Sequence, residues 1–98
     1  MHKKGFYRGK TEEEIQNLVK KDGFNPIKIK DSPNFVYTPH NHPETKLLAI
    51  LSGSMSAKVA KKKFVLNPGD QLIISGNVIH SATVGSEGCT FFWSEKMI

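Results

Sequence analysis

The stretch that decides the fold is Thr38-Pro39-His40-Asn41-His42-Pro43, together with His80 farther along the chain. His40 and His42 are two residues apart, and a β-strand alternates its faces with a period of two, so both imidazoles are expected to point the same way. His80 follows Pro68-Gly69-Asp70 in a second apolar, β-rich stretch. Neutral imidazole is the commonest metal ligand among side chains. Three histidines that converge inside a barrel therefore predict a site for one divalent ion, with coordination positions left open.

A short helix is expected near the N-terminus. Thr11 can cap it, and Glu14 lies three residues on, which completes a capping box. Acidic residues follow the cap and lysines come last, as the helix dipole favours. Because Asp22-Gly23 ends the pattern, the sequence predicts a helix over about residues 11–22 that packs one apolar face outside the main sheet.

From Pro26 onward the hydrophobic pattern changes to the period of two that is typical of strands. Short apolar segments alternate with turn signals at intervals of about 8 to 12 residues, which favours a sandwich or barrel over a βαβ sheet. Ser52-Gly53 is interpreted as a turn, and residues 85–88 as the connection between the last two strands. The expected strands are 27–30, 35–38, 47–51, 55–59, 64–66, 72–74, 78–84 and 89–93. We expect one all-β domain, with residues 1–10 as a basic N-terminal arm and residues 11–98 as the barrel domain.

The histidine motifs resemble those of the cupin family of small jelly-roll barrels. The family's first motif, G-x5-H-x-H-x3,4-E-x6-G, falls on Asn34, His40, His42, Lys46 and Gly53. Its second motif, G-x5-P-x-G-x2-H-x3-N, falls on Gly69, Ser75, Asn77, His80 and Val84. The resemblance covers about residues 35–94, and it implies a single-domain cupin jelly-roll β-barrel with a short N-terminal helix.

Lys46 occupies the position of the family's acidic metal ligand. If its ammonium pointed inward about 5 Å from a divalent ion, the repulsion at an effective dielectric constant of about 20 would be roughly 6 to 7 kcal/mol. Three outcomes would relieve it: Lys46 swings away and pairs with Glu44 or solvent, Lys46 loses its proton, or no metal binds and the imidazoles line an organic or anion pocket. The stretch resembles a small-cupin variety that reads His-x-His-Pro-Glu-x-Lys, in which this lysine is a regular feature.

The expected metal ligands are His40, His42 and His80, with Glu44 as a substitute for the missing carboxylate. Zn, Fe, Mn, Ni and Cu all suit this donor set, and the sequence does not choose among them. By resemblance, the family includes isomerases, dioxygenases, decarboxylases and pure binders, so enzyme status stays open. In an enzyme, the metal would act on a small carbonyl or carboxylate metabolite, in an isomerase- or dioxygenase-like reaction, with Lys46 and Glu44 as catalytic candidates. The main alternative is a non-catalytic sensor that binds a small anion without metal.

Each of these residues also has a plainer structural interpretation. His40 and His42 could be polar residues near a barrel rim. His80 could be a core histidine whose ring donates a hydrogen bond to a carbonyl, and Glu44 and Lys46 could form a surface ion pair. Three large side chains are expected to line the barrel and make a mostly apolar small-molecule pocket: Met55, Phe91 and Trp93.

Positive charge is concentrated in two places. The formal net charge is +5, and the excess lies in residues 2–10 and in Lys61-Lys62-Lys63. A nucleic-acid-binding accessory protein is therefore a second alternative. No stacking-aromatic motif or basic recognition helix accompanies these lysines. A solvated N-terminal arm with a frayed His2, plus a lysine-rich hairpin turn, is the favoured interpretation, and nucleic acid is not an expected partner.

The remaining composition bears on location and assembly. Cys89 is the single cysteine, so no internal disulfide can form, which favours a reducing cytoplasm and a small buried hydrophobe at this position. No apolar run approaches the length of about 18 residues that a transmembrane helix needs, so no membrane association is expected. A chain of 98 residues builds only a modest core, and we expect a homodimer that binds a small molecule.

Overall fold

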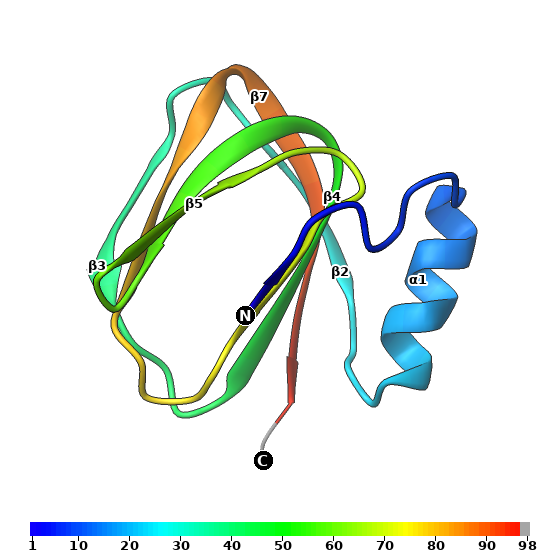
Figure 1. Ribbon diagram of the computed structural model, residues 1–98, viewed down its shortest axis with the longest axis horizontal. Coiled ribbons are helices and arrows are strands. Elements are labelled where there is room, and N and C mark those ends of the chain that lie inside the picture. The colour runs from blue at the N-terminus through cyan, green and yellow to red at the C-terminus, as the bar shows by residue number, and fades with distance from the viewer. Residues whose placement is uncertain (97–98) are drawn as a thin grey trace.

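The computed structural model describes residues 1–96, which form a curved antiparallel sheet with one helix packed outside it (Figure 1). The elements are β1 (His2–Lys3), α1 (Glu12–Lys21), β2 (Ile27–Asp31), β3 (Val36–His40), β4 (Thr45–Val59), β5 (Lys62–Leu66), β6 (Gln71–Ile74) and β7 (His80–Lys96). The sheet runs β1-β6-β4-β7-β2, with β5 added on β4 and β3 added on β7. The predicted all-β architecture with one short N-terminal helix is confirmed, whereas residues 97–98 of the expected barrel domain lie outside the described range.

Two long bent strands, β4 and β7, hold the barrel together. The sequence predicted each of them as two separate strands, and this is wrong, because each continues through its glycine-containing middle. The register between them shifts around Ser52 and Gly53, so the predicted turn at Ser52-Gly53 is a bulge. Gly53 has φ 74°, and a Cβ on it would lie 2.0 Å from the Gly88 carbonyl oxygen. The bend therefore requires backbones to pass closer than any side chain allows.

Alternation along the two long strands separates an inner core from an outer one. Inside the barrel, Leu48 and Ile50 of β4 pack with Phe91 of β7. On the outer face, Leu47 and Ala49 pack beneath the helix and the N-terminal arm. Cys89 is buried inside the barrel, which confirms the predicted small buried side chain, and burial together with Asp31 raises the pKa of its thiol to about 11.

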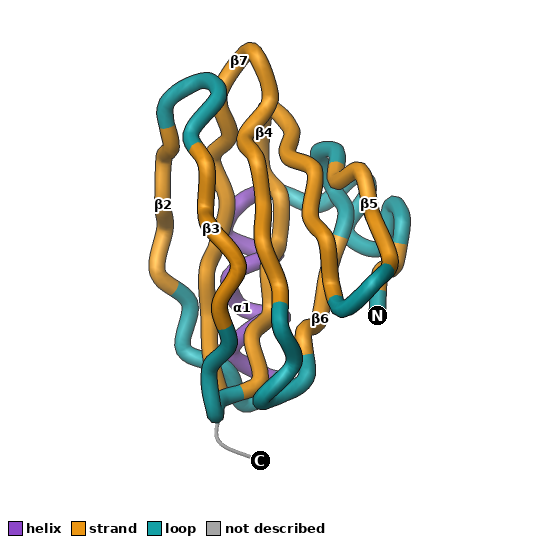
Figure 2. The backbone as a smooth tube through the Cα atoms, turned by 90° about the vertical axis from the view of Figure 1, so that its left-hand side faces the viewer, coloured by secondary structure: helices purple, strands orange, loops and turns teal. Residues whose placement is uncertain are grey.

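The helix α1 covers the outer face of the sheet, where it lies beside β2 in Figure 1 and behind the strands in Figure 2. Thr11 and Glu14 form the predicted capping box, in which the Thr11 amide donates to Glu14 and the Glu14 amide donates to the Thr11 hydroxyl. Ile15 and Val19 are buried against the sheet, as the apolar stripe predicted. Among residues 1–96, no helix is long and apolar enough to cross a bilayer.

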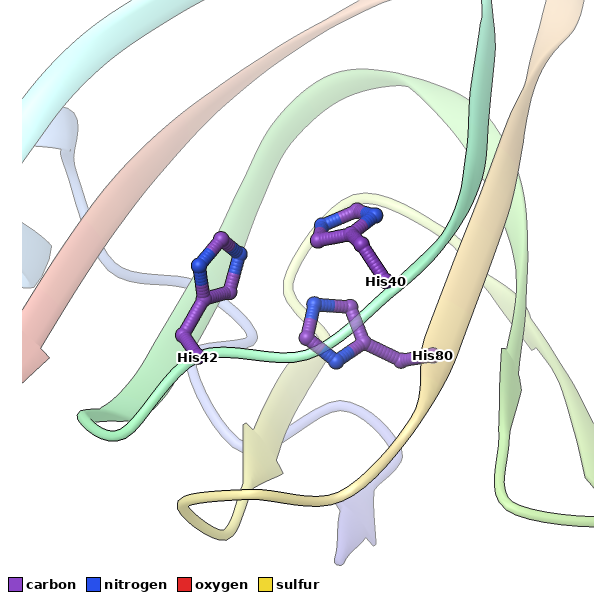
Figure 3. A group of neighbouring side chains, drawn as sticks. All are labelled: His40, His42 and His80. Carbon is purple, nitrogen blue, oxygen red and sulfur yellow. The ribbon is translucent and has the colours of Figure 1, made fainter.

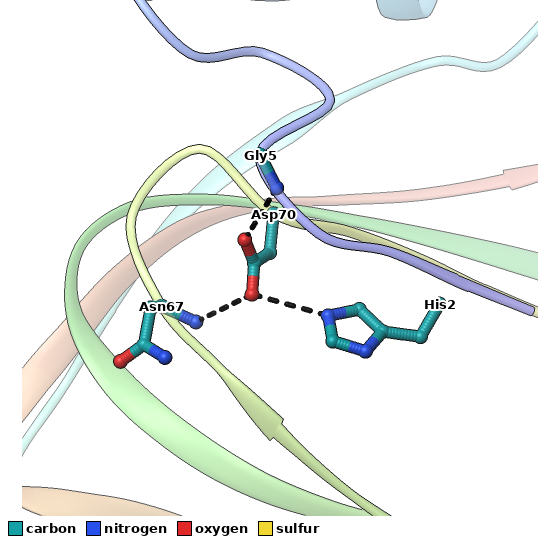
Figure 4. A network of polar contacts seen from close by, with 4 residues as sticks. All are labelled: His2, Gly5, Asn67 and Asp70. Atoms are coloured by element: carbon teal, nitrogen blue, oxygen red, sulfur yellow. Dashed lines mark hydrogen bonds and ion pairs between the residues drawn. The ribbon is translucent and has the colours of Figure 1, made fainter.

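The N-terminal arm is docked, which corrects the expectation of a solvated arm with a frayed His2. His2 and Lys3 form β1 and pair with β6, and Tyr7 is buried beside the helix. Asp70, which is only 2% exposed, accepts hydrogen bonds from the Gly5 amide at 2.8 Å, the Asn67 amide at 3.0 Å and His2 Nε2 at 3.1 Å (Figure 4). Burial alone would raise the pKa of Asp70, but these hydrogen bonds outweigh it and hold the pKa below its usual value.

We expect Asp70→Asn to reduce the free energy of unfolding by about 2 kcal/mol at pH 7, because an amide replaces a carboxylate that accepts three hydrogen bonds. A carboxyl group with a lowered pKa stabilises the fold above its unfolded pKa of about 3.9, and this contribution is lost as the pH falls through the folded pKa. Urea unfolding should therefore show a wild-type advantage at pH 7 that disappears at low pH. Asp22→Asn, at an exposed carboxylate, is the control, and a pH-independent loss in Asp70→Asn would contradict this account.

Candidate metal centre and ligand pocket

The three predicted histidines come together from separate parts of the chain (Figure 3). His40 ends β3, His42 lies in the following loop, and His80 begins β7 directly opposite His40. One ring nitrogen of each histidine lies within 4.8 Å of the others. The His-x-His spacing therefore does bring two imidazoles to one place, although His42 lies beyond the end of its strand.

The hydrogen bonds of these rings leave nitrogen lone pairs free. The His40 Nδ1 contacts the Thr38 carbonyl, and the His80 Nδ1 contacts the Val78 carbonyl at 2.9 Å. Because a carbonyl only accepts, each Nδ1 carries the proton and each Nε2 keeps its lone pair. The Nε2 atoms of His42 and His80 are buried and have no hydrogen-bond partner within residues 1–96. Buried nitrogens without partners are costly, so these residues fit a bound metal ion well.

Burial and nearby positive charge lower the pKa values of two of the imidazoles, those of His42 and His80. Burial lowers the pKa of His42, and Lys46 and the neighbouring imidazoles lower it further. Burial lowers the pKa of His80 by more than its hydrogen bond to Val78 raises it. Both rings are therefore uncharged at pH 7, which is the form that coordinates a metal.

The turn before β7 positions the loop that carries His42. The Asn77 amide donates to the His42 carbonyl, and Asn77 has a left-handed φ of 64°, which asparagine adopts more readily than most residues. A Cβ on Gly76 would lie 2.3 Å from the Pro43 carbonyl oxygen. Residues 75–77 connect the expected strands 72–74 and 78–84, but the sequence gave no sign that this connection contacts the histidine loop, because the contact joins segments more than 30 residues apart.

Lys46 points into the barrel and is only 4% exposed, because it has the same strand parity as Leu48 and Ile50. Its Nζ lies 2.7 Å from Glu95 Oε1 and 3.7 Å from Glu44 Oε1. The Nζ also lies 5.1 Å from the centroid of the Trp93 ring. Glu95 was not predicted as a site residue. Its alternation with Phe91 and Trp93 indicated an inward direction, but only the β4–β7 register, which pairs Lys46 with Glu95, reveals its partner.

Glu44 lies beside Lys46. The donor atoms that lie within 4.8 Å of one another belong to the three imidazoles, and the Glu44 carboxylate is not among them. The Glu44–Lys46 pair is not a surface ion pair as the plainer interpretation had it, because the Lys46 side chain is 5% exposed. Lys46 thus pairs with Glu44, as the first of the three expected outcomes had it, but it does not swing away from the barrel interior, and its nearer partner is Glu95.

An apolar cavity of about 30 Å³ lies next to the histidines. Its walls include the three predicted lining residues, Met55, Phe91 and Trp93, together with Tyr37, His40, Leu48 and Ala82. His42 stacks edge-on near Trp93, with ring centroids 6.2 Å apart. A cavity of this size holds about one or two small atoms beyond the polar site, since a single water needs roughly 10–15 Å³.

Residues 28–95 match the family described as the AraC-like ligand binding domain. The chain belongs to this family. The AraC-like domain is also similar to solved cupin structures, which confirms the predicted cupin resemblance. An RmlC-like cupin from Shewanella frigidimarina is 19% identical with a TM-score of 0.69, and covers 76% of this chain and 67% of that chain. The finer His-x-His-Pro-Glu-x-Lys variety stays a prediction.

Two further structures share the fold of this AraC-like domain. A conserved protein of unknown function from Streptococcus pyogenes is 13% identical with a TM-score of 0.68, covering 76% of this chain and 65% of that chain. Bacillus subtilis oxalate decarboxylase, which has Mn(II) centres, is 18% identical with a TM-score of 0.67, covering 76% of this chain and 21% of that chain. This chain therefore spans about two thirds or less of these proteins. No curated protein sequence matches it.

Proposed function

We propose that this AraC-like domain binds one divalent transition-metal ion through His40, His42 and His80, and that the site binds a small ligand. The observation that carries the proposal is the pair of buried Nε2 atoms, on His42 and His80, that have no partner within residues 1–96. These nitrogens belong to imidazoles whose donor atoms lie within 4.8 Å of one another and which are neutral at pH 7. Zn, Mn, Fe, Ni and Cu suit such a site.

The ligand we propose is a small carbonyl or carboxylate metabolite. A metal bound by the histidines would supply Lewis-acid polarisation of such a group. Lys46 would orient the ligand or carry a proton, with Glu44 as its charged neighbour. Isomerase- or dioxygenase-like chemistry would need these contributions, and ligand sensing would need only the binding.

Elemental analysis of protein purified without chelator tests the metal site. We expect about one transition-metal ion per chain, and the chelator-treated protein should take up Zn²⁺ with a change in the fluorescence of Trp93, the only tryptophan. Metal-free protein that does not respond to any of the five metals would overturn the proposal. If that protein still bound a small anion, the non-catalytic alternative without metal would be favoured.

Two other expectations stay predictions. A homodimer is compatible with several large apolar side chains that remain exposed, among them Phe35, Val36, Val65 and Ile79.

The nucleic-acid alternative gains one observation, because the docked arm brings His2 against Phe64 and the N-terminal amine near Lys62, so the two basic segments lie together.

A further inference from the structure

The ammonium of Lys46 is an unusual group to find beside a metal site. Lys46 is the lysine among residues 1–96 that is buried, at 4% exposure. It shares the Trp93 ring with His42, since the Nζ lies 5.1 Å and the His42 ring 6.2 Å from the Trp93 ring centroid. The position of the acidic ligand in the cupin motif is thus occupied by a positive charge. This charge and the His42 imidazole both lie near the Trp93 ring.

The two carboxylates that balance Lys46 come from the barrel rim. The Glu95 side chain is 51% exposed and the Glu44 side chain 28% exposed, whereas that of Lys46 is 5% exposed. An exposed carboxylate can turn into water at little cost, but a buried ammonium cannot leave without a partner. Glu95 is therefore a replaceable counter-ion rather than a permanent one.

The charge of the site depends on whether a metal is bound. If the imidazoles are counted in the neutral form that binds a metal, the one ammonium and the two carboxylates give the group a net charge of minus one. A divalent ion changes this to plus one. Electrostatic attraction would then favour the entry of one further anion, and the exposed Glu95 is the group that such an anion can replace.

We propose that Lys46 binds the anionic end of the ligand, a small carboxylate that takes the place of Glu95 on the Lys46 ammonium. This inference rests on the proposed metal site for the second positive charge. The ligand's apolar part must be short, because the neighbouring cavity lined by His40 and Trp93 has a volume of only about 30 Å³. Acetate, with one methyl group, matches both requirements.

The test is a titration of zinc-loaded and chelator-treated protein with sodium acetate, followed by Trp93 fluorescence and by calorimetry. Methylammonium chloride at equal ionic strength is the comparison ligand. We expect acetate to bind the zinc-loaded protein more tightly than the chelator-treated protein, and methylammonium to have no effect. Lys46→Met should weaken acetate binding about tenfold or more, because it removes a charge-assisted hydrogen bond.

Glu95→Gln gives the opposite expectation, since it removes the group that competes for Lys46, and acetate should bind several-fold more tightly. A purely structural role for the Lys46–Glu95 pair would not produce opposite changes in the two variants. Lys28→Met is the matched control, because Lys28 also forms an ion pair, at 3.1 Å to Glu12, but on the outer surface. It should bind acetate as the wild type does.

The outcomes separate the two proposals. Equal acetate affinity in wild type and Lys46→Met, in either metal state, overturns the role of Lys46 while leaving the metal site intact. Failure to bind zinc overturns the metal site. In that case the titration of chelator-treated protein alone tests the anion site, and acetate binding that Lys46→Met abolishes still supports it. Tighter acetate binding in Lys46→Met would overturn it outright.

Discussion

We expect His42→Ala to abolish stoichiometric metal binding and to lower the zinc affinity at least about a hundredfold. The substitution removes one of three imidazole donors that converge within 4.8 Å, and the two remaining imidazoles cannot enclose the ion. Competition with a chromophoric chelator measures the affinity directly. His80→Ala should have a similar effect, because its Nε2 is likewise buried and without a partner in residues 1–96.

His2→Ala is the matched control, because His2 is a histidine that contacts Asp70 and Phe64 instead of the other three imidazoles. It should bind zinc as tightly as the wild type. Zinc affinity that survives in His42→Ala, or falls equally in His2→Ala, would contradict the proposed ligand set.

The same substitution separates a binding role from a structural one. In metal-free protein the His42 Nε2 is a buried nitrogen whose hydrogen-bonding capacity is unused, which costs stability. His42→Ala removes this cost along with some ring packing, so metal-free His42→Ala should unfold at a urea concentration close to that of the wild type. The zinc-induced gain in stability, by contrast, should be lost.

The second large effect is expected at the bend of the two long strands. We expect Gly53→Ala to reduce the free energy of unfolding by more than about 4 kcal/mol, a large fraction of the total for a domain of this size. The new Cβ would lie 2.0 Å from the Gly88 carbonyl oxygen, a backbone atom that cannot move without separating β4 from β7. Chemical denaturation followed by circular dichroism measures the loss.

Gly9→Ala supplies the comparison for this variant. Gly9 has φ 79°, close to the φ 74° of Gly53, but a Cβ there meets nothing within 4 Å. It should therefore show only the conformational penalty of about 1 to 2 kcal/mol. If both variants lost the same stability, the close approach of β4 and β7 would not be the reason for a glycine at position 53.

Local patterns were sufficient for much of this fold and site. The capping box of Thr11 and Glu14 defined the helix to within about a residue, because capping depends on neighbours along the chain. The spacing of His40 and His42 predicted that these two imidazoles point the same way, and the resemblance to the cupin motifs implied that His80 joins them, as it does. Alternation with a period of two placed Met55, Phe91 and Trp93 on the cavity wall.

Other features depended on which strands are paired, and in what register. The amino-acid sequence by itself determined an all-β domain of short strands with one capped helix, and its resemblance to the cupin motifs implied three histidines in reach of one another and a lysine where a carboxylate is usual. Only the tertiary structure decided that Glu95 pairs with Lys46, that Asp70 secures the N-terminal arm, and that β4 and β7 each continue through their glycines. Cross-strand partners are set by register between distant segments, and no pattern within one segment carries that information.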